Sequence, residues 1–559
     1  MSRKILLAFA CLLAISLLVF AQERERVDLN VIHKIKVAEL GSGGGFGGGG
    51  GGFGGGGRAA SQVMNIMYNL TDRYGPRLTN SPQFRRAGDW AAGQLKEWGL
   101  SNVHLEKWPT AGGRGGAIPS WEVTGYSGAM VEPTYMPLVG YPQAWSGSTD
   151  GPLTGEVVLA PVQTPADLDK WHGKVKGKIV FMSAMLELPF PENPLAHRYS
   201  DQELANLVPE VLPTGGRGGR GGRAGQPNPL ANMTPEERQA FTEKQRSFYK
   251  DEGALMLVTA SARGESGTVF ASNGSARSGD PTKNIPSVAI TAENYNRIMR
   301  LVEHQVPVKL SFDIKTKFDM SDTDSFNVVG EIPGTTKPEE VVMVGGHFDS
   351  WHMGTGATDN AAGSAVAMEV MRVLKTLNLK MDRTVRIAMW GGEEQGLLGS
   401  AAYVKSHFAD PTVMKPTPEH DKFAAYFNID NGTGRIRGIY LQGNEMARPI
   451  FEQWFAALKD LTPGAITIRN TGGTDHQSFD RVGLPGFQFI QDPMDYDTRT
   501  HHSNMDVYDR IQQADMTQMA IIEAVFVYHA ATRPEKFPRV DLPAPQPQGG
   551  RGGRGGRGN

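Results

Sequence analysis

The chain has 559 residues, of which 39% are hydrophobic and 21% are charged. The length exceeds one typical domain of about 100–200 residues, so we expect a globular protein with two domains and tails. The net charge of −2 excludes a strong overall attraction to nucleic acid or to anionic membranes.

The first 21 residues have the layout of a secretory signal. Two basic residues precede an apolar run from Ile5 to Phe20, and Ala21 stands before a charged segment. The run is short for a membrane span. We therefore expect a secreted or periplasmic protein without a stable membrane anchor; the alternative is an uncleaved anchor. The only cysteine, Cys11, would be removed with the signal, which excludes disulfide and thiolate chemistry in the mature chain.

Glycine-rich tracts punctuate the chain. Residues 22–60 contain an almost pure glycine run and are predicted to be a flexible linker. Arg-Gly-Gly units recur at 215–223 and in the Pro-rich tail, 536–559. They could bind RNA, as disordered arginine-rich segments do, or be solvated insertions. We favour insertions and expect no nucleic-acid partner, because the signal and the near-neutral charge argue against an RNA-binding protein.

Between the tails, three regions follow one another. Residues 61–124 are predicted to be helical and then extended, with apolar residues at helical spacing from Ala87 to Trp98 and a stop at Gly99. Residues 125–310 change to short β runs with turn signals and predict an inserted β-rich domain. Its clearest predicted strands are Glu156–Leu159, Lys178–Met182, Leu255–Thr259 and Ser287–Ile290.

Residues 311–535 alternate strands and helices from Phe326 onward. This alternation predicts βαβ units, and hence a three-layer α/β/α domain around a mostly parallel, mixed sheet. The predicted strands are Val341–Val344, Thr384–Trp390, Phe423–Ile429, Ala465–Arg469 and Phe487–Ile490. The predicted helices are Ala361–Leu377, Leu397–Val404, Ala447–Leu458 and Thr517–Ala531.

Acidic and histidine side chains follow these predicted strands repeatedly. Such a sheet binds ligands beyond the carboxyl ends of its strands, so the groups should meet at one edge. Each alone could be a core histidine, a helix cap or a turn residue. Those explanations do not account for all of them sharing one edge. The residues are His347, Asp349, Asp359, Glu393, Glu394, Asp430, His501 and His502.

Nitrogen and carboxylate donors without thiolate suit a catalytic Zn²⁺ site, with Co²⁺ or Mn²⁺ as substitutes. There are more candidate ligands than one zinc with an open position needs. Two metals bridged by one carboxylate use them economically. The adjacent Glu393 and Glu394 then divide the work, because one binds metal while its neighbour acts as general base.

These segments resemble the co-catalytic zinc aminopeptidase family, the peptidase family of bacterial leucyl aminopeptidase, and most closely its carboxypeptidase Q branch. The spacing of twelve from His347 to Asp359 fits that branch. The middle region resembles a protease-associated domain at Val175–Val180 and Ile285–Ile290. The runs that carry the family resemblance are Gly345–Trp351, Thr358–Gly363, Trp390–Gly396, Asn428–Asp430 and His502–Asp506, with Gly75–Thr79 and Gly473–Asp475.

The resemblance implies a zinc exopeptidase fold, with residues 61–124 and 311–535 forming the catalytic domain. It implies one zinc on His347, Asp359 and Asp430 and a second on Asp359, Glu394 and His502.

It further implies that Glu393 is the general base and that Asp349 orients His347 through its other ring nitrogen. A cis peptide is expected at Asp359–Asn360. The branch implies a homodimer. We expect a secreted di-zinc exopeptidase, of aminopeptidase or dipeptidase type, acting on peptides. Its specificity and the roles of His501, Asp475 and His476 stay open.

Three alternatives remain. A non-catalytic relative would use the same fold for binding. A glutaminyl cyclase-like acyltransferase would use one zinc. An RNA-binding protein would depend on the Arg-Gly-Gly tracts and would lose salt-sensitive binding without them.

Overall fold

The structure is a computed structural model. It describes residues 25–41, 61–110, 117–208, 233–261, 263–271 and 284–545. The predicted signal, residues 42–60 of the predicted linker and the Arg-Gly-Gly tracts lie outside these ranges, so the predictions for them stay predictions. Residues 29–40, which were predicted to belong to the linker, instead form a helix whose Val31, Ile32 and Ile35 are buried in the hydrophobic core. Phe537 of the predicted tail is buried in the same core. In the described ranges, no helix has both the length and the apolar character that a bilayer crossing requires.

The main sheet has eight strands in the order β1-β10-β12-β11-β15-β18-β16-β17. Four of the seven pairings are parallel, which confirms the predicted mostly parallel, mixed sheet. The strands are β1 (Ser101–Trp108), β10 (Ser325–Ile332), β11 (Lys337–His347), β12 (Arg383–Trp390), β15 (Phe423–Asn428), β16 (Ile436–Tyr440), β17 (Ala465–Thr467) and β18 (Gly486–Gln491). A separate short hairpin pairs β13 (Ala409–Asp410) with β14 (Lys415–Pro416).

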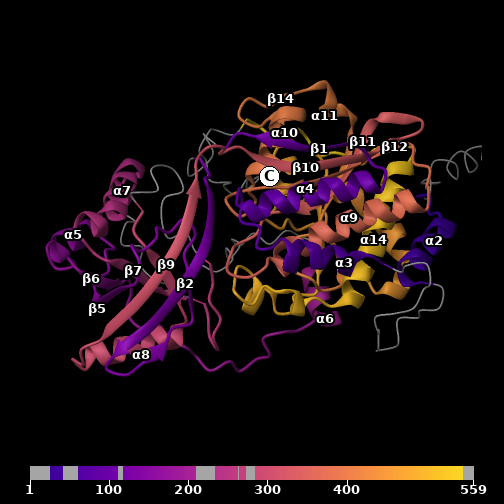
Figure 1. Ribbon diagram of the computed structural model, residues 1–559. Helices are drawn as coiled ribbons and strands as arrows, with labels where there is room; N and C mark the ends of the chain where they lie inside the picture. The colour runs from indigo at the N-terminus through magenta and orange to yellow at the C-terminus, as the bar shows by residue number, and fades with distance from the viewer. Residues whose placement is uncertain are drawn as a thin grey trace, which may run out of the picture.

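Helices cover both faces of this sheet. Val342 and Val344 of β11 belong to the larger core, whereas Val341 and Met343 belong to a second core on the opposite face. This alternation gives the three layers that the sequence predicts. The larger core holds α2 (Leu29–Leu40), α3 (Val63–Tyr68), α4 (Pro82–Glu97), α9 (Ala362–Thr376), α12 (Arg448–Ala456) and α14 (Gln513–Thr532), several of which are seen in Figure 1. The other face carries α10 (Leu398–His407) and α13 (His476–Asp480), and the short α11 (Pro418–Lys422) precedes β15.

Strand β16 is absent from the sequence prediction. Its run Ile436–Tyr440 contains Arg437 and Gly438, which weaken the β pattern. A Cβ on Gly438 would lie 1.8 Å from the carbonyl oxygen of Ala465, so glycine allows β16 to pair closely with β17.

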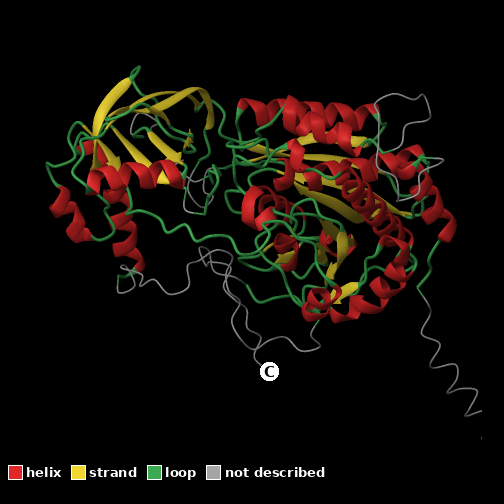
Figure 2. Ribbon diagram, turned by 90° about the horizontal axis from the view of Figure 1, so that it is seen from below, coloured by secondary structure: helices red, strands yellow, loops and turns green. Residues whose placement is uncertain are grey.

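A second eight-stranded sheet forms a β-rich unit, which we define as residues 120–319 of the described chain. Its order is β3-β2-β9-β5-β6-β7-β8-β4. The strands are β2 (Ser120–Glu132), β3 (Met136–Pro137), β4 (Gly140–Pro142), β5 (Leu153–Leu159), β6 (Lys178–Phe181), β7 (Met256–Ala260), β8 (Ser287–Ile290) and β9 (Lys309–Asp319). Its helices α5 (Pro165–Trp171), α7 (Pro235–Asp251) and α8 (Ala292–Glu303) lie with this sheet in Figures 1 and 2.

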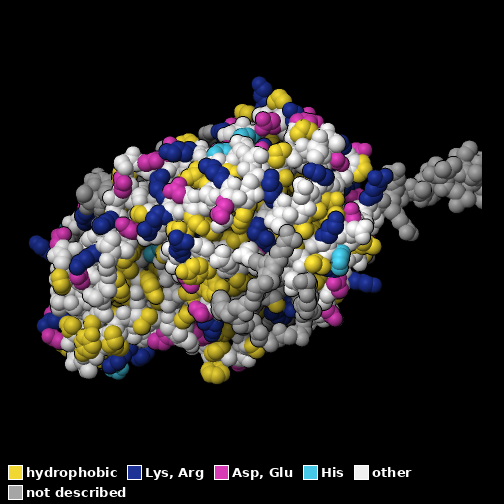
Figure 3. Space-filling view, turned by 45° about the vertical axis from the view of Figure 1, so that its right-hand side comes forward, with side chains coloured by type: hydrophobic (Ala, Val, Ile, Leu, Met, Phe, Trp, Pro, Cys, Tyr) yellow, Lys and Arg dark blue, Asp and Glu magenta, His cyan; other side chains and the backbone are white. Residues whose placement is uncertain are grey.

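The β-rich unit also contacts the main domain through the segment that follows β6. After β6 the chain crosses to α6 (Asp201–Leu207), which lies with the main domain in Figure 1. Arg198 forms ion pairs there with Asp492 at 3.0 Å and Asp515 at 2.7 Å, and both aspartates are buried. The crossing segment is therefore fixed to the main domain. Figure 3 shows Lys and Arg side chains interspersed with Asp and Glu over one face of the molecule.

Candidate metal and catalytic site

Three parallel strands end at the candidate site. β11 ends at His347, β12 ends just before the turn that carries Glu393 and Glu394, and β15 ends two residues before Asp430. Because β11 pairs in parallel with both β12 and β15, these carboxyl ends lie at one sheet edge. The shared edge predicted from the sequence is therefore present. Gly345 allows the close pairing there, since a Cβ would lie 1.9 Å from the Ala388 carbonyl oxygen.

His347 stands at the centre of the first group. Its Nε2 lies 3.2 Å from Asp359 Oδ1 and 3.3 Å from Asp430 Oδ1. All three side chains are buried, and their donor atoms are close enough to hold one cation. The structure thus brings together the three residues predicted for one metal.

His502 stands at the centre of the second group. Its Nε2 lies 3.2 Å from Asp359 Oδ2 and 2.9 Å from Glu394 Oε2. Asp359 thus presents one oxygen to each group, as a bridging carboxylate would. The peptide bond between Asp359 and Asn360 is cis, as the resemblance implied.

His501 lies beside this second group. Its Nε2 is 3.8 Å from Asp359 Oδ2, and its ring centroid is 3.8 Å from that of His502. Asp359, His501 and His502 also form a set whose donor atoms could hold a cation. The sequence prediction assigned His501 no role; the structure places it beside the predicted ligands, farther from Asp359 than His502 is.

The carboxylates of the site strongly perturb one another. Burial raises the pKa of Glu393 well above its usual value, and the negative charges of Asp430, Asp475 and Glu394 raise it further. Burial and the charge of Asp359 likewise raise the pKa of Glu394. Burial opposes ionisation of Asp359 too, but the hydrogen bond from His347 and the charges of both neighbouring histidines lower its pKa overall.

Asp349 holds the turn that carries the two glutamates. Its Oδ1 accepts a hydrogen bond from the backbone N–H of Glu393 at 3.1 Å, and its Oδ2 accepts one from Glu394 at 3.3 Å. Its contact with His347 differs from the one expected. His347 Nδ1 lies 3.0 Å from the Asp349 backbone oxygen, whereas the carboxylate Oδ1 is 3.8 Å away. The backbone carbonyl therefore orients the imidazole more closely than the carboxylate does.

Two buried residues that the sequence prediction gave no role support the loop from His347 to Asp359. The guanidinium of Arg77 donates to the backbone oxygens of Leu70, Phe348, Thr355 and Gly356. Asp506 accepts from the N–H of Thr358 at 2.5 Å and from that of Asp359 at 3.3 Å. Both belong to runs that carried the family resemblance, which was the only signal for them.

The β-rich unit braces the loop that carries His502. The Ala271 N–H donates to the His502 carbonyl at 2.6 Å. Asn504 receives a hydrogen bond from the Val269 N–H on its side-chain oxygen at 2.7 Å and returns one from its own N–H at 3.0 Å. Residue His502 itself has a left-handed backbone, with φ of 64°. The brace holds a conformation that a histidine rarely adopts.

Asp475 and His476 are both buried near this site. Burial raises the pKa of Asp475 to about 7, and its charge contributes to the raised pKa of Glu393. Burial lowers the pKa of His476 to about 4, and its Nε2 lies 3.2 Å from the Thr471 carbonyl oxygen. Asp475 therefore influences the site electrostatically, while His476 contacts its own loop.

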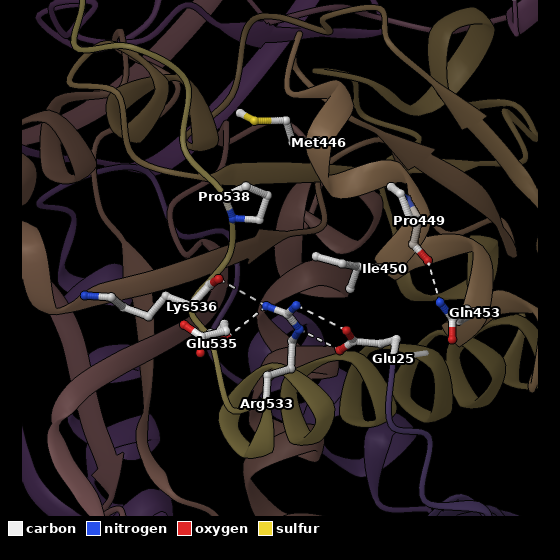
Figure 4. Close-up of a pocket in the computed structure, with 9 residues that line it drawn as sticks. All are labelled: Glu25, Met446, Pro449, Ile450, Gln453, Arg533, Glu535, Lys536 and Pro538. Atoms are coloured by element: carbon white, nitrogen blue, oxygen red, sulfur yellow. Dashed lines mark hydrogen bonds and ion pairs between the residues drawn. The ribbon is translucent and has the colours of Figure 1, made fainter. Parts of the chain in front are cut away.

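One cavity lies away from the candidate site residues, and a smaller one adjoins them. A cavity of about 330 Å³ is lined by none of the candidate site residues and contains the Arg533–Glu25 ion pair, as Figure 4 shows. A smaller one, of about 70 Å³, adjoins the site because Asn431 follows Asp430 and Tyr496 packs on His501 with ring centroids 4.7 Å apart. This smaller cavity is also lined by Tyr199 of the crossing segment.

Residues 327–527 match the sequence pattern described as Peptidase family M28. This segment, which carries all the candidate metal ligands, is an M28 peptidase domain. This confirms the family suspected from the sequence and confirms that the protein is an enzyme, a metallopeptidase. Murine carboxypeptidase Q is 27% identical over 482 residues, covering 84% of this chain and 86% of the relative. Human carboxypeptidase Q is 27% identical over 472 residues, covering 84% and 85%.

Two solved peptidase structures share the fold. A peptidase M28 precursor from Shewanella amazonensis superposes with a TM-score of 0.61 at 23% identity, covering 92% of this chain and 99% of that one. A zinc aminopeptidase from Bacillus subtilis gives 0.53 at 19% identity, covering 84% and 95%. The expected zinc exopeptidase fold is therefore confirmed.

The donor set fits the metals that family M28 implies. Two imidazoles and three carboxylates converge without any thiolate, which is the chemistry of zinc sites with open positions. Glu394 Oε1 is buried and accepts no hydrogen bond from any residue in the described ranges. A buried carboxylate oxygen without a donor is costly unless a cation meets it.

Proposed function

We propose that this M28 metallopeptidase is a di-zinc exopeptidase that hydrolyses peptide bonds in short peptides or dipeptides. The observation that carries the proposal is the position of Asp359, whose two oxygens each lie 3.2 Å from the Nε2 of a different histidine. One metal would be held by His347, Asp359 and Asp430, and the other by Asp359, Glu394 and His502. Co²⁺ or Mn²⁺ could substitute for Zn²⁺.

When bound, such cations lower the pKa of a shared water and polarise the scissile carbonyl group. Glu393 then accepts a proton from the attacking water. Burial raises the pKa of Glu393, so its carboxylate is a stronger base than an exposed glutamate. The same carboxyl group delivers the proton to the leaving amine as the peptide bond breaks.

Asp349 supports this proton transfer without touching the substrate. By accepting from the N–H groups of Glu393 and Glu394, its carboxylate fixes the base relative to its neighbouring ligand. A fixed base is effective because small displacements of a catalytic group reduce the rate strongly.

The β-rich unit is proposed to be a protease-associated domain inserted at about residues 125–310 between the two catalytic segments. Export is proposed from the N-terminal signal, and a homodimer from the likeness to carboxypeptidase Q.

The test is a peptide screen with the purified protein at defined zinc content. Free dipeptides and tripeptides are compared with N-blocked and C-blocked forms, with and without a chelator. Turnover that requires a free terminus, stops on chelation and returns with about two zinc ions per chain supports the proposal. Turnover of peptides blocked at both ends contradicts an exopeptidase.

One zinc per chain together with cyclisation of N-terminal glutamine would indicate the acyltransferase alternative. A protein that takes up no zinc and cleaves nothing would indicate a binding relative.

A further inference from the structure

Thr79 occupies an unusual position behind the candidate base. It lies in the loop before α4, more than 300 residues before Glu393 in the chain, and is fully buried. Its hydroxyl oxygen is 2.8 Å from Asp349 Oδ2 and 2.5 Å from Gln395 Oε1. Gln395 follows the two glutamates directly and is 7% exposed. The Thr79 hydroxyl therefore links the Asp349 carboxylate, which holds the turn of Glu393 and Glu394, to Gln395 in that turn.

The single hydrogen of the Thr79 hydroxyl limits which hydrogen bonds it can donate. A threonine hydroxyl has one hydrogen and can donate to only one of the two oxygens. Rotation of the Gln395 amide exchanges the positions of its oxygen and nitrogen. Its Nε2 has no partner among the described residues in the present orientation. With the amide turned, Gln395 donates to Thr79, and Thr79 donates to Asp349.

We propose that Thr79 is a positioning residue for the base. Its hydroxyl fixes Asp349 Oδ2, which accepts from the Glu394 N–H, while Asp349 Oδ1 accepts from the Glu393 N–H. Loss of the hydroxyl releases the carboxylate on one side and Gln395 on the other. The glutamate turn then samples more conformations, and Glu393 spends less time aligned with the water. This inference rests on the proposed function.

The anchoring of Thr79 explains how so distant a segment can position the site. Arg77, two residues earlier, donates its N–H to Ser350 Oγ at 3.0 Å, and its carbonyl accepts from the Ser350 N–H at 3.0 Å. The loop therefore lies directly against the segment that follows Asp349. Thr79 is held in place by these contacts, so its own substitution removes the hydroxyl without removing the loop.

The test compares Thr79→Val, which has nearly the same shape without the hydroxyl, with Thr79→Ser, which keeps it. We expect Thr79→Val to lower kcat about tenfold to a hundredfold with KM and zinc content nearly unchanged, because misalignment affects the chemical step. Thr79→Ser should stay within about threefold of wild type.

A structural control is available in Thr384. Its buried hydroxyl also donates once and accepts once, to Pro338 O and from Gly334 N, but it stands at the opposite end of β12 from the site. Thr384→Val should lower the unfolding stability as much as Thr79→Val and leave kcat unchanged. Equal kcat losses in both valine variants would show a general effect of destabilisation and overturn the proposal.

A readout without turnover separates this proposal from the proposed function. Amide hydrogen exchange of the peptide covering residues 390–398 reports the turn itself. Thr79→Val should speed exchange at Glu393 and Glu394 about tenfold, and Thr79→Ser should not. Unchanged exchange in Thr79→Val, or equal effects of Val and Ser, overturns the positioning role. If exchange changes as expected while the wild type cleaves no peptide, the proposed function fails and the positioning of the turn stands.

Discussion

His502 and Glu394 meet at 2.9 Å, between His502 Nε2 and Glu394 Oε2, whereas Nε2 of the adjacent His501 lies 3.8 Å from Asp359 Oδ2. We therefore expect His502→Ala to reduce bound zinc from about two ions to about one and to lower kcat/KM by at least about a hundredfold. His501→Ala should keep both ions. Metal analysis of the two purified variants checks this, and the reverse pattern would exchange the roles of the two histidines.

Glu393→Gln should retain both metals and lose catalysis. The amide keeps the shape of the side chain but cannot accept a proton from water, and general-base catalysis contributes about 10²–10⁴-fold. Turnover by initial rates and zinc by elemental analysis are measured on the same sample. A variant that cleaves peptides at the wild-type rate would remove Glu393 from the mechanism.

Asn504→Ala should weaken binding of the metal at His502. The substitution removes the hydrogen bond from Val269 and loosens the brace between the β-rich unit and the ligand loop. Loss of an outer support typically costs about tenfold to a hundredfold in metal affinity. Competition with a zinc chelator measures the change. Asn444→Ala is the control, because the Asn444 side chain also hydrogen-bonds to the backbone, by donating to the Pro538 oxygen, but lies away from the site.

The pair of His407 and Glu106 predicts a pH-dependent contribution to stability. Their hydrogen bond of 2.9 Å raises the pKa of His407 and ties α10 to β1. A raised histidine pKa stabilises the fold fully below the unfolded pKa of about 6.5, and the contribution is lost as pH rises through the folded value. His407→Gln should therefore cost up to about 1 kcal/mol at pH 6 and less at pH 9. Urea unfolding at both pH values measures it; a larger loss at pH 9 would contradict this sign.

The main elements and the candidate ligands follow from local patterns. A buried parallel strand is a continuous apolar run, so Val341–Val344 and Phe423–Ile429 are visible in the sequence, and the acids at their ends mark the sheet edge. β16 is not visible in this way, since Arg437 and Gly438 interrupt its run and its place depends on β17 and β18.

The supporting contacts depend on long-range geometry. Thr79 meets Asp349 across 270 residues, and Val269 meets Asn504 across 235. No spacing rule joins such pairs, because the contact exists only after the sheet has formed. The same holds for Asp349, for which the family resemblance implied the His347 imidazole as partner, while the folded turn offers two backbone N–H groups instead.

The β-rich unit leaves and rejoins the main domain through paired strands, since Ser120 of β2 lies opposite Asp319 of β9. Such neighbouring ends would let an ancestral gene gain or lose about 200 residues at one point without disturbing the sheet that carries the ligands. The hydrogen bonds from Val269 and Ala271 to the His502 loop work against that freedom. If His502 binds metal as proposed, the β-rich unit that supports it must change together with the main domain, so the two parts of this enzyme are expected to have evolved as one.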